Sequence, residues 1–255
     1  MRYFTSDLHF GSTNILTYAS RPFSTAKEAR GTLIANINET CDRSDILFHV
    51  GDFMLQGTDR HGEVEDCGLG DTQDVLLQKI KCPVILLSGN HDDAHNCVTH
   101  IKKMTIDLGC YRNISVSHFP LTYENYRYVG NENHKSCSDK IHIHLCGHVH
   151  DKWMLFFDAK AHVLNYNVGV DCHNYKPVKA SQIKEDLDFI FTYHDFNQSW
   201  KMTVQNMIEW KIKIKVKLNN DREKRKQERY RKKGLTEAEC LRRKEEALRK
   251  KGILK

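Results

Sequence analysis

Five short runs of β-branched and aromatic residues between positions 2 and 146 constrain the fold of this chain more than any other feature. Each run has the length of a strand and ends at polar or turn-forming residues. Helix-like stretches at 25–40, 72–80 and 93–104 separate several of them. Strands that alternate with helices predict an α/β sheet. The five runs are RYFTS (2–6), DILFHV (45–50), PVILLS (83–88), NISVS (113–117) and IHIHLC (141–146).

The stretch at 25–40 has the clearest helix signals. Thr25 and Glu28 have the spacing of a capping box, in which each side chain satisfies a backbone amide at the helix start. One apolar stripe at helical spacing is formed by Ala26, Ala29, Leu33, Ile34 and Ile37. Two other segments, 55–70 and 125–140, are rich in Gly, Asn, Asp and Ser, so we expect long loops there.

The net charge of +6 conceals two parts of opposite sign. Residues 211–255 contain 19 Lys and Arg against 7 Asp and Glu, a net charge of +12, which leaves −6 for residues 1–210. We therefore expect a folded domain over residues 1–195 and a basic C-terminal extension over residues 196–255. The basic extension is expected to be attracted to polyanions such as nucleic acid.

The extension begins with an alternating segment, KIKIKVKL (211–218). Four lysines would lie on one face of a strand, and Ile212, Ile214, Val216 and Leu218 on the other. This alternation predicts a half-buried edge strand. Further on, Thr236 and Glu239 have capping-box spacing and predict a charged helix that Gly252 would close. That helix is either a binding element or a solvated, partly frayed one.

Composition excludes several classes of protein. No apolar run approaches the ~20 residues of a membrane span, so we expect no membrane partner. The first residues lack the apolar core of a secretory signal. Nine cysteines without any C-x-x-C pair argue against a disulfide framework and a cysteine zinc site. We therefore expect reduced thiols and a cytoplasmic protein.

Potential metal ligands follow each of the five predicted strands. The segments are SDLH (6–9), VGDF (50–53), SGNHD (88–92), SHFP (117–120) and GHVHD (147–151). Because the carboxyl ends of strands in an open α/β sheet meet at one crevice, these side chains should converge. Asp7 and His9 are two positions apart, as are His148 and His150, so each pair would point to one face of an extended chain. The converging set is Asp7, His9, Asp52, Asn90, His91, His118, His148 and His150.

The chemistry of this set favours divalent transition metals. It offers carboxylates, imidazoles and an amide oxygen but no thiolate, which suits manganese, iron or zinc. The set is too large for one tetrahedral ion and suits two ions about 3.5–4 Å apart that share a carboxylate. Asp52 is the predicted bridge, because the preceding Gly51 lets the backbone and the ions approach closely.

The order of these segments resembles the signature of the calcineurin-like metallophosphoesterases. That signature is D-x-H, G-D, G-N-H-[D/E], a single H and G-H-x-H, and all five blocks occur in this order between residues 7 and 150. The surrounding YFTSDLHFG, RPF (21–23) and NVGVDCHNYKPV (167–178) are similar to compact bacterial and phage-encoded members. The resemblance covers roughly residues 1 to 190. It implies a four-layer fold, with two packed mixed β-sheets flanked by helices.

The resemblance also implies a role for each residue of the set. One metal would be held by Asp7, His9, Asp52 and His150, and the other by Asp52, Asn90, His118 and His148. His91 would be free of metal and act as the general acid, and Asp92 would orient it. The two ions would be manganese first, with iron, zinc or nickel as alternatives. One departure is Ser12, where compact members usually have histidine, and this leaves a substrate contact in question.

The expected function is two-metal hydrolysis of phosphate esters. The cations would make a bridging hydroxide available to attack phosphorus in line, and His91 would protonate the leaving oxygen. Phosphodiesters rank slightly ahead of phosphomonoesters, because the basic extension suggests a nucleotide or nucleic-acid substrate. Two alternatives are a non-catalytic scaffold, and a nucleic-acid-binding or ribosome-binding protein that acts through residues 211–255. The expected location is the cytoplasm, including that of a phage-infected bacterial host.

The remaining histidines have weaker signals. His49 lies inside a predicted strand and is expected to be packed. His142 and His144 share one strand face and are expected to be partly buried and satisfied. His95, His134 and His173 occupy positions at the expected rim and receive no role.

Overall fold

The computed structural model of the chain describes residues 1–55, 72–92, 101–126 and 141–232, together with residues 239, 242–243, 245–246 and 249. The chain divides into two compact units, Met1–Val204 and Gln205–Lys255. The boundary lies beyond the expected position at residues 195/196, because strand β10 (Trp200–Met202) pairs with strand β7 (Leu155–Asp158) of the first unit.

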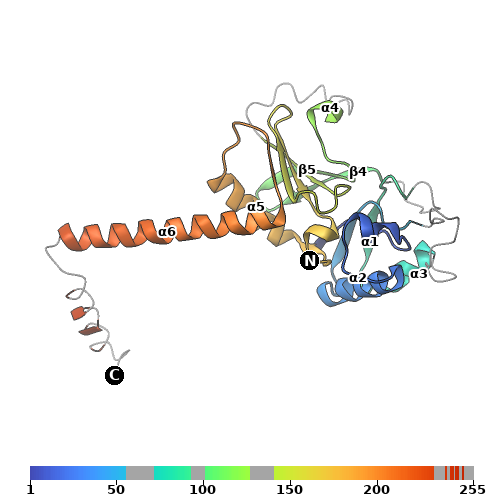
Figure 1. The fold of residues 1–255 in the computed structure, drawn as a ribbon, viewed down its shortest axis with the longest axis horizontal. Coiled ribbons are helices and arrows are strands. Elements are labelled where there is room, and N and C mark those ends of the chain that lie inside the picture. The colour runs from blue at the N-terminus through green and yellow to red at the C-terminus, as the bar shows by residue number, and fades with distance from the viewer. Residues whose placement is uncertain are drawn as a thin grey trace. The chain divides into compact units, whose positions relative to one another are not determined.

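The first unit contains two mixed β-sheets, as expected (Figure 1). The four-stranded sheet has the order β3-β2-β1-β9, in which β1, β2 and β3 are parallel and β9 is antiparallel. Its strands are β1 (Arg2–Thr5), β2 (Ile46–Val50), β3 (Val84–Leu87) and β9 (Val178–Lys179).

The six-stranded sheet has the order β10-β7-β8-β6-β5-β4, with parallel pairing from β8 through β6 to β5. Its other strands are β4 (Lys103–Leu108), β5 (Tyr111–Ser117), β6 (His142–Cys146) and β8 (Val163–Asn167). All five strands predicted from sequence are therefore present, but they divide between two sheets. Together with the helices they form a layered α/β sandwich.

Within the described residues, the helices of this unit are α1 (Asn14–Tyr18), α2 (Ala26–Thr40), α3 (Gln73–Gln78), α4 (Tyr123–Tyr126), the short 3-10 helix η3 (Val170–Cys172) and α5 (Ala180–Tyr193). The capping box of α2 is confirmed, because the Glu28 amide donates to Thr25 Oγ1 at 3.1 Å. The Glu28 carboxylate in turn accepts from the Ser24 amide at 2.8 Å. Helix α3 confirms the prediction at 72–80.

The predicted helix at 93–104 is wrong at its C-terminal end, where β4 begins at Lys103. Strand β4 pairs antiparallel with β5, and this pairing overrides the local helix signal. Residues 93–100 lie outside the described residues, as do 56–71 and 127–140, which contain most of the two predicted loops. Helix α5 was not anticipated, although Ile183, Leu187 and Ile190 have helical spacing and are buried.

A hydrophobic core lies between the four-stranded sheet and helices α2 and α3. Leu33 and Ile37 of α2 are buried in it with Leu76 of α3. From the sheet, Tyr3 and Leu47 enter the same cluster as register partners on β1 and β2. Burial of such side chains contributes about 1.5–3 kcal/mol each. This packing fixes β1 and β2, whose carboxyl ends carry the first two predicted ligand segments.

A long helix, α6 (Val204–Lys232), starts at the last residue of the first unit and forms the beginning of the second unit. The prediction of an edge strand at 211–218 is therefore wrong. A helix satisfies its own backbone amides and carbonyls, whereas a strand needs a neighbouring strand. The charged run after Asn219 consists mostly of good helix formers. The predicted capping box at Thr236 lies outside the described residues, apart from the helical Glu239.

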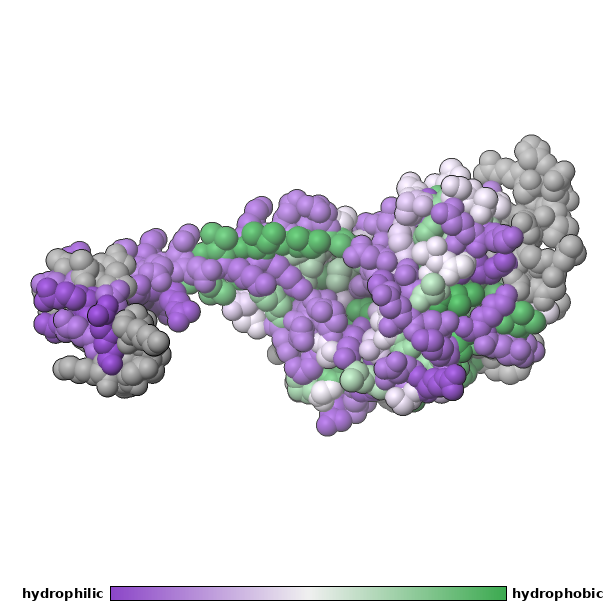
Figure 2. Space-filling view, turned by 90° about the horizontal axis from the view of Figure 1, so that it is seen from below, coloured by the Kyte–Doolittle hydropathy of each residue, from purple (hydrophilic) through white to green (hydrophobic). Residues whose placement is uncertain are grey.

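Helix α6 exposes apolar side chains among its lysines. Ile208, Ile212 and Val216 follow one another at intervals of four positions and are 48%, 55% and 51% exposed. They form a stripe that runs along the helix in the space-filling view (Figure 2). The predicted two-residue alternation therefore does not become one apolar and one basic face. Among the described residues, no helix has the length and apolar character needed to cross a membrane.

Candidate metal centre

The segments that follow β1 and β2 are joined by backbone hydrogen bonds. The Asp7 amide donates to the Gly51 carbonyl at 3.1 Å, and the His9 amide donates to the Asp52 carbonyl at 3.0 Å. Farther along, Phe10 and Met54 form an isolated parallel bridge. This pairing places the D-x-H segment directly beside the Gly-Asp segment, as the convergence of strand ends predicts.

Side chains from both sheets meet at this point. Within each of three groups, one nitrogen or oxygen atom per side chain lies within 4.8 Å of the others. The groups share Asp52 and His9, so they form one continuous cluster. They are Asp7, His9 and His150; His9, Asp52 and His91; and Asp52, His118 and His148.

Asn90 joins the cluster through its side-chain oxygen. Oδ1 of Asn90 lies 3.1 Å from His118 Nε2 and 3.0 Å from His148 Nδ1. Asp52 Oδ2 also lies 3.1 Å from His118 Nε2. The structure thus brings together all seven predicted metal ligands. Its grouping differs in part from the two sets that the resemblance implies, because the group of His9 and Asp52 also contains His91, which was predicted to be free of metal.

The expectation that the paired ligands lie on an extended chain is wrong. Asp7 and His9 have φ of 60° and 49°, in the left-handed region, and His148 and His150 have φ of 71° and 51°. Asp52, at 59°, shares this conformation. Such angles are uncommon outside glycine, and Asp and His adopt them more readily than most residues. Strained backbone of this kind gathers at functional sites.

Close backbone packing surrounds the cluster. A Cβ atom at Gly51, which has φ of +88°, would lie 2.6 Å from His118 Nδ1 and 2.8 Å from the Gly89 amide nitrogen. At Gly147 a Cβ atom would lie 2.0 Å from Ser6 Oγ and 2.5 Å from Asp7 Oδ2. Glycine is thus required here for close approach, as predicted for Gly51.

Asp92 has a different role from the one predicted. Its buried carboxylate accepts hydrogen bonds from the backbone amides of Asp52 at 2.8 Å, Phe53 at 2.9 Å and Gly89 at 2.7 Å. No hydrogen bond between Asp92 and the His91 ring occurs among the described residues. Asp92 therefore holds the turns that carry Asp52 and Asn90 instead of orienting His91, and it is a positioning residue.

His91 belongs to the cluster and is only partly buried. Its backbone amide donates to Asp52 Oδ1 at 3.0 Å, and its ring centroid lies 5.2 Å from that of His9 in an edge-on arrangement. The ring is partly exposed and lies within ligand distance of Asp52 and His9. The general-acid role of His91 stays a prediction.

The hydrogen bonds of His118 indicate that a positive charge belongs in the cluster. Its Nδ1 must carry a proton, because it lies 2.9 Å from the Val50 carbonyl oxygen, which can only accept. In a neutral ring Nε2 is then an acceptor, yet it faces the acceptor oxygens of Asp52 and Asn90. A proton or a metal cation at this point removes the conflict.

The pKa shifts of the buried groups also indicate that a positive charge is favoured in the cluster. Burial opposes protonation of His118, but its hydrogen bond to Asp52 and the charge of Asp7 raise its pKa to about 9. Burial also opposes ionisation of Asp52, yet the hydrogen bond from His118 holds the pKa of this carboxyl below its usual value. Burial lowers the pKa of His9 well below its usual value, so His9 is neutral and can donate a lone pair.

The donor set fits divalent cations. Both ring nitrogens of His9 are buried and lack a hydrogen-bond partner within the described parts of the chain. His49 lacks hydrogen-bond partners in the same way but belongs to none of the three ligand groups, whereas His9 belongs to two of them. An imidazole buried without a hydrogen bond is costly unless another group binds it, and the neighbours of His9 are those of a cation site. Neutral imidazoles with carboxylate and amide oxygens are ligands for manganese, iron or zinc. His9, Asp52 and His118 thus satisfy the requirements of a metal site.

Two residues that sequence reasoning missed support this cluster. Asp171 in η3 accepts from His150 Nδ1 at 2.9 Å. Arg21 donates to both carboxylate oxygens of Asp171, at 2.8 and 3.0 Å, and to the Asp7 carbonyl oxygen at 2.6 Å. This arrangement leaves Nε2 of His150 as the nitrogen that would bind a metal. Arg21 and Asp171 lie in the RPF and NVGVD segments, which contributed only to the family resemblance.

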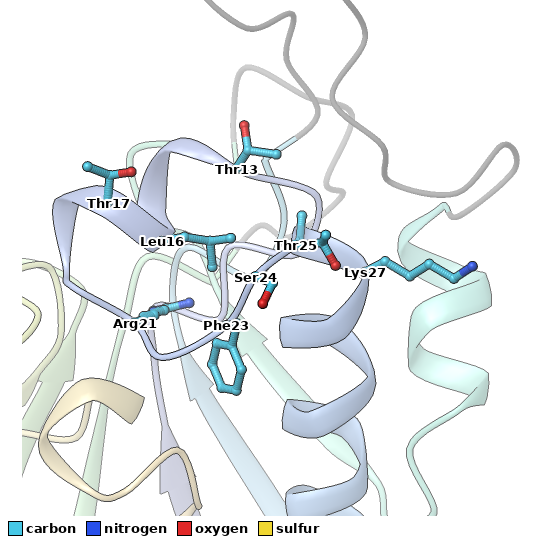
Figure 3. Close-up of a pocket in the computed structure, with 9 residues that line it drawn as sticks. Thr13, Leu16, Thr17, Arg21, Phe23, Ser24, Thr25 and Lys27 are labelled. Carbon is cyan, nitrogen blue, oxygen red and sulfur yellow. The ribbon is translucent and has the colours of Figure 1, made fainter.

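A hollow of about 440 Å³ lies next to Arg21. Its walls come from α1, from the segment that follows α1, and from the first turn of α2 (Figure 3). The hydroxyl of Thr25 and the carboxylate of Glu28 already satisfy backbone amides at the start of α2. Ser12, the departure from the family pattern, is buried beside α1, and its hydroxyl accepts from the Ile15 amide at 3.4 Å.

The packed histidines behave as predicted. His49 is fully buried and lies edge-on to Phe53 at 5.1 Å. His142 and His144 both bond to Ser115 Oγ at 2.7 Å, which confirms a shared strand face. His173, which was expected at the rim, is half-buried and stacks on Tyr166 with ring centroids 5.9 Å apart. His95 and His134 lie outside the described residues.

The fold and the cluster define a layered α/β protein with a candidate centre for two cations. No family model matches the chain. MJ1445, an uncharacterized protein of Methanocaldococcus jannaschii, is 33% identical over 90 residues, which are 35% of this chain and 46% of that protein. The chain thus matches less than half the length of this curated relative.

A solved structure supports the fold. The crystal structure of AQ665, a protein of unknown function from Aquifex aeolicus, matches 72% of this chain and 98% of its own chain with a TM-score of 0.51 and 20% identity. At this identity the likeness concerns the fold alone. Neither relative is named for an activity, so membership of the calcineurin-like metallophosphoesterases stays a prediction from the motifs.

Proposed function

We propose that this protein is a metal-dependent phosphoesterase that hydrolyses phosphate esters with two divalent cations. The observation that carries the proposal is the acceptor-rich cluster around Asp52. In it, His118 Nε2 faces two oxygen atoms at 3.1 Å. The buried ring nitrogens of His9 have no hydrogen-bond partner among the described residues, and His9 Nε2 faces Asp52 Oδ2 at 3.4 Å. A pair of cations, manganese first and iron, zinc or nickel as alternatives, would satisfy all of these groups.

When bound, two such cations would activate water and neutralise the oxygens of a phosphoryl group. The residues of the chain would have three further roles. Asp52 joins the two ligand sets, and Asp92 holds its backbone in position. His91 would donate a proton to the departing oxygen as the bond between phosphorus and that oxygen breaks and the bond to the water oxygen forms. A positioned general acid contributes typically ~10²–10⁴-fold.

The first test is hydrolysis of bis(4-nitrophenyl) phosphate and 4-nitrophenyl phosphate by protein stripped with chelator and reloaded with manganese, nickel or zinc. We expect turnover with metal and none without it. Asp52→Asn should lower turnover by more than about 100-fold, as for loss of one key electrostatic group. Asp74→Asn, on the exposed first turn of α3, is the matched control and should behave as wild type. Equal turnover after complete metal removal would exclude this function.

A second candidate function is nucleic-acid binding through residues 211–255. Between residues 211 and 232, α6 carries eleven Lys and Arg against three Asp and Glu, and most of these side chains are exposed. This density of positive charge favours binding to the phosphate backbone of nucleic acid. It is also the reason for ranking phosphodiesters slightly ahead of phosphomonoesters. A protein that only bound nucleic acid would do so equally well after Asp52→Asn.

The place of action is part of the proposal. The five cysteines within the described residues are all free thiols: Cys41, Cys82, Cys110, Cys146 and Cys172. Free thiols suit a reducing compartment such as the cytoplasm. Fractionation of the native cells is the direct test.

A further inference from the structure

Two exposed aromatic rings lie directly against the ligand cluster. Tyr18, the last residue of α1, is 61% exposed, and its ring lies edge-on to His150 with centroids 5.4 Å apart. Phe119 is 48% exposed, and its centroid lies 4.6 Å from that of His148 and 5.2 Å from that of His118. One ring therefore adjoins the ligand set of Asp7, and the other adjoins the set that contains His118.

Hydrogen bonds to buried side chains fix the backbone at and near Phe119. The ring of the buried His144 must donate through Nε2 to the Phe119 carbonyl oxygen at 3.0 Å, and it accepts through Nδ1 from Ser115 Oγ. Next to it, the Leu121 amide and carbonyl both bond to the side chain of Asn165, at 2.8 and 2.9 Å. The exposed ring therefore sits on a fixed backbone, and little conformational entropy is lost when it binds a partner.

Tyr18 is held by a cation. Lys152 Nζ donates to the Tyr18 hydroxyl at 2.9 Å and also lies 5.4 Å from the centroid of the ring. Both side chains are exposed. Tyr18 thus presents an aromatic surface next to a positive charge, which is the combination that binds a base and its phosphate in single-stranded nucleic acid.

The number of rings bears on the type of ester. A single exposed aromatic residue is ordinary on a protein surface, but here each of the two ligand sets has one. A phosphomonoester has one organic substituent on phosphorus, whereas a phosphodiester has two. A phosphorus atom held between the two sets would have one substituent near Tyr18 and the other near Phe119.

We propose that Tyr18 and Phe119 determine specificity by stacking on nucleobases, and that the substrate class is a phosphodiester between nucleosides in a single strand. This inference rests on the proposed phosphoesterase function. Stacking on one aromatic side chain contributes roughly 5- to 150-fold in affinity per base. Lys152 adds attraction for the adjoining phosphate.

The test compares two esters with the same leaving group, thymidine 5′-(4-nitrophenyl phosphate) and methyl 4-nitrophenyl phosphate. The preference is the ratio of their kcat/KM values. We expect wild type to prefer the thymidine ester. Either Tyr18→Ala or Phe119→Ala should reduce the preference by roughly 5- to 150-fold. The other variant should slow both esters in parallel, because its ring would contact the shared nitrophenyl group.

Conservative variants and a distant ring serve as controls. Tyr18→Phe and Phe119→Tyr keep a ring and should keep most of the preference. Tyr193→Ala removes an exposed ring of α5 that packs on Phe189 at 4.9 Å, and it should behave as wild type. Metal content per chain should be unchanged in all variants. An unchanged preference in both Tyr18→Ala and Phe119→Ala, or no preference in wild type, would overturn the inference.

A binding measurement separates this inference from the proposed function. If the metal-loaded wild type hydrolyses neither ester, the proposed function fails, and calorimetry with thymidine 5′-monophosphate and inorganic phosphate decides the role of the rings. Loss of the preference for the nucleotide over phosphate in a ring variant supports base stacking. Equal binding of both ligands by wild type and by the Tyr18→Ala and Phe119→Ala variants refutes it.

Discussion

Replacing Gly89 with alanine tests how closely the backbone packs on the Asp52 carboxylate. A Cβ atom at Gly89 would lie 2.1 Å from Asp52 Oδ1 and 2.5 Å from the Asp52 amide nitrogen. Because comfortable nonbonded contacts of carbon begin at about 3.5 Å, the carboxylate and its turn must move by roughly 1 Å. Overpacking of this kind costs about 1–3 kcal/mol and sometimes more. We expect Gly89→Ala to displace the ligand that joins the two metal sets.

Thermal unfolding with and without manganese measures both consequences. For a domain of about 150–250 residues, 1 kcal/mol shifts Tm by about 2–4 °C, so metal-free Gly89→Ala should melt roughly 2–12 °C below wild type. Manganese should raise the Tm of wild type, because a ligand that binds only the folded state stabilises it. The variant should show little or no such rise.

Gly31→Ala is the matched control. Gly31 lies inside α2, and a Cβ atom there would meet no atom within 4 Å. Alanine in place of glycine in a helix interior stabilises by about 0.5–1 kcal/mol, which raises Tm by roughly 1–4 °C. The manganese response should be that of wild type. If Gly89→Ala kept both the wild-type Tm and the manganese response, the proposed contact between Gly89 and the Asp52 carboxylate would be refuted.

Three other features of the chain lead to further predictions. Asp171→Asn removes the charge that orients His150, so we expect metal affinity, measured by calorimetry, to fall about 10- to 100-fold; unchanged affinity would contradict this. Burial lowers the pKa of His144 to about 4, so stability is lost as pH falls from about 6.5 through 4, by up to about 3 kcal/mol. Urea unfolding of metal-free protein should show this slope, and His144→Asn should flatten it; an equal slope in both proteins would disprove the assignment. Deleting residues 220–255 should spare hydrolysis of small esters and reduce the salt dependence of nucleic-acid binding, by about 0.9 in the log–log slope for each duplex phosphate that the segment neutralises; equal slopes would show that this segment neutralises none.

The convergence of the predicted metal ligands could be anticipated because it depends on strand ends. Each ligand segment follows a strand whose composition is evident in the sequence, and the two sheets bring these ends together. The manner in which the pairs converge was not predictable. Asp7 and His9 adopt left-handed backbone angles, which follow from the backbone pairing with Gly51 and Asp52 and have no local sequence signal.

Long-range contacts explain the other differences between prediction and structure. The Asp92 carboxylate accepts a hydrogen bond from the backbone amide of Asp52, 40 residues earlier in the chain. This tertiary contact cannot be inferred from the position of Asp92 next to His91 in the sequence. Asp171 and Arg21 are separated by 150 residues and pair only in the folded chain. The lysine-isoleucine alternation at 211–218 predicted a strand, but no partner strand pairs with this segment in the described part of the chain, and the helix satisfies its own backbone.

Bound manganese per chain, measured together with hydrolysis of bis(4-nitrophenyl) phosphate along a metal titration, tests the central claim most directly. The seven-ligand cluster predicts two equivalents at saturation, and turnover that rises as the second equivalent binds. The Asp52→Asn variant should bind at most one equivalent and stay near the background rate. Full turnover without bound metal, or only background turnover with two equivalents bound, would contradict the proposal of a two-metal phosphoesterase.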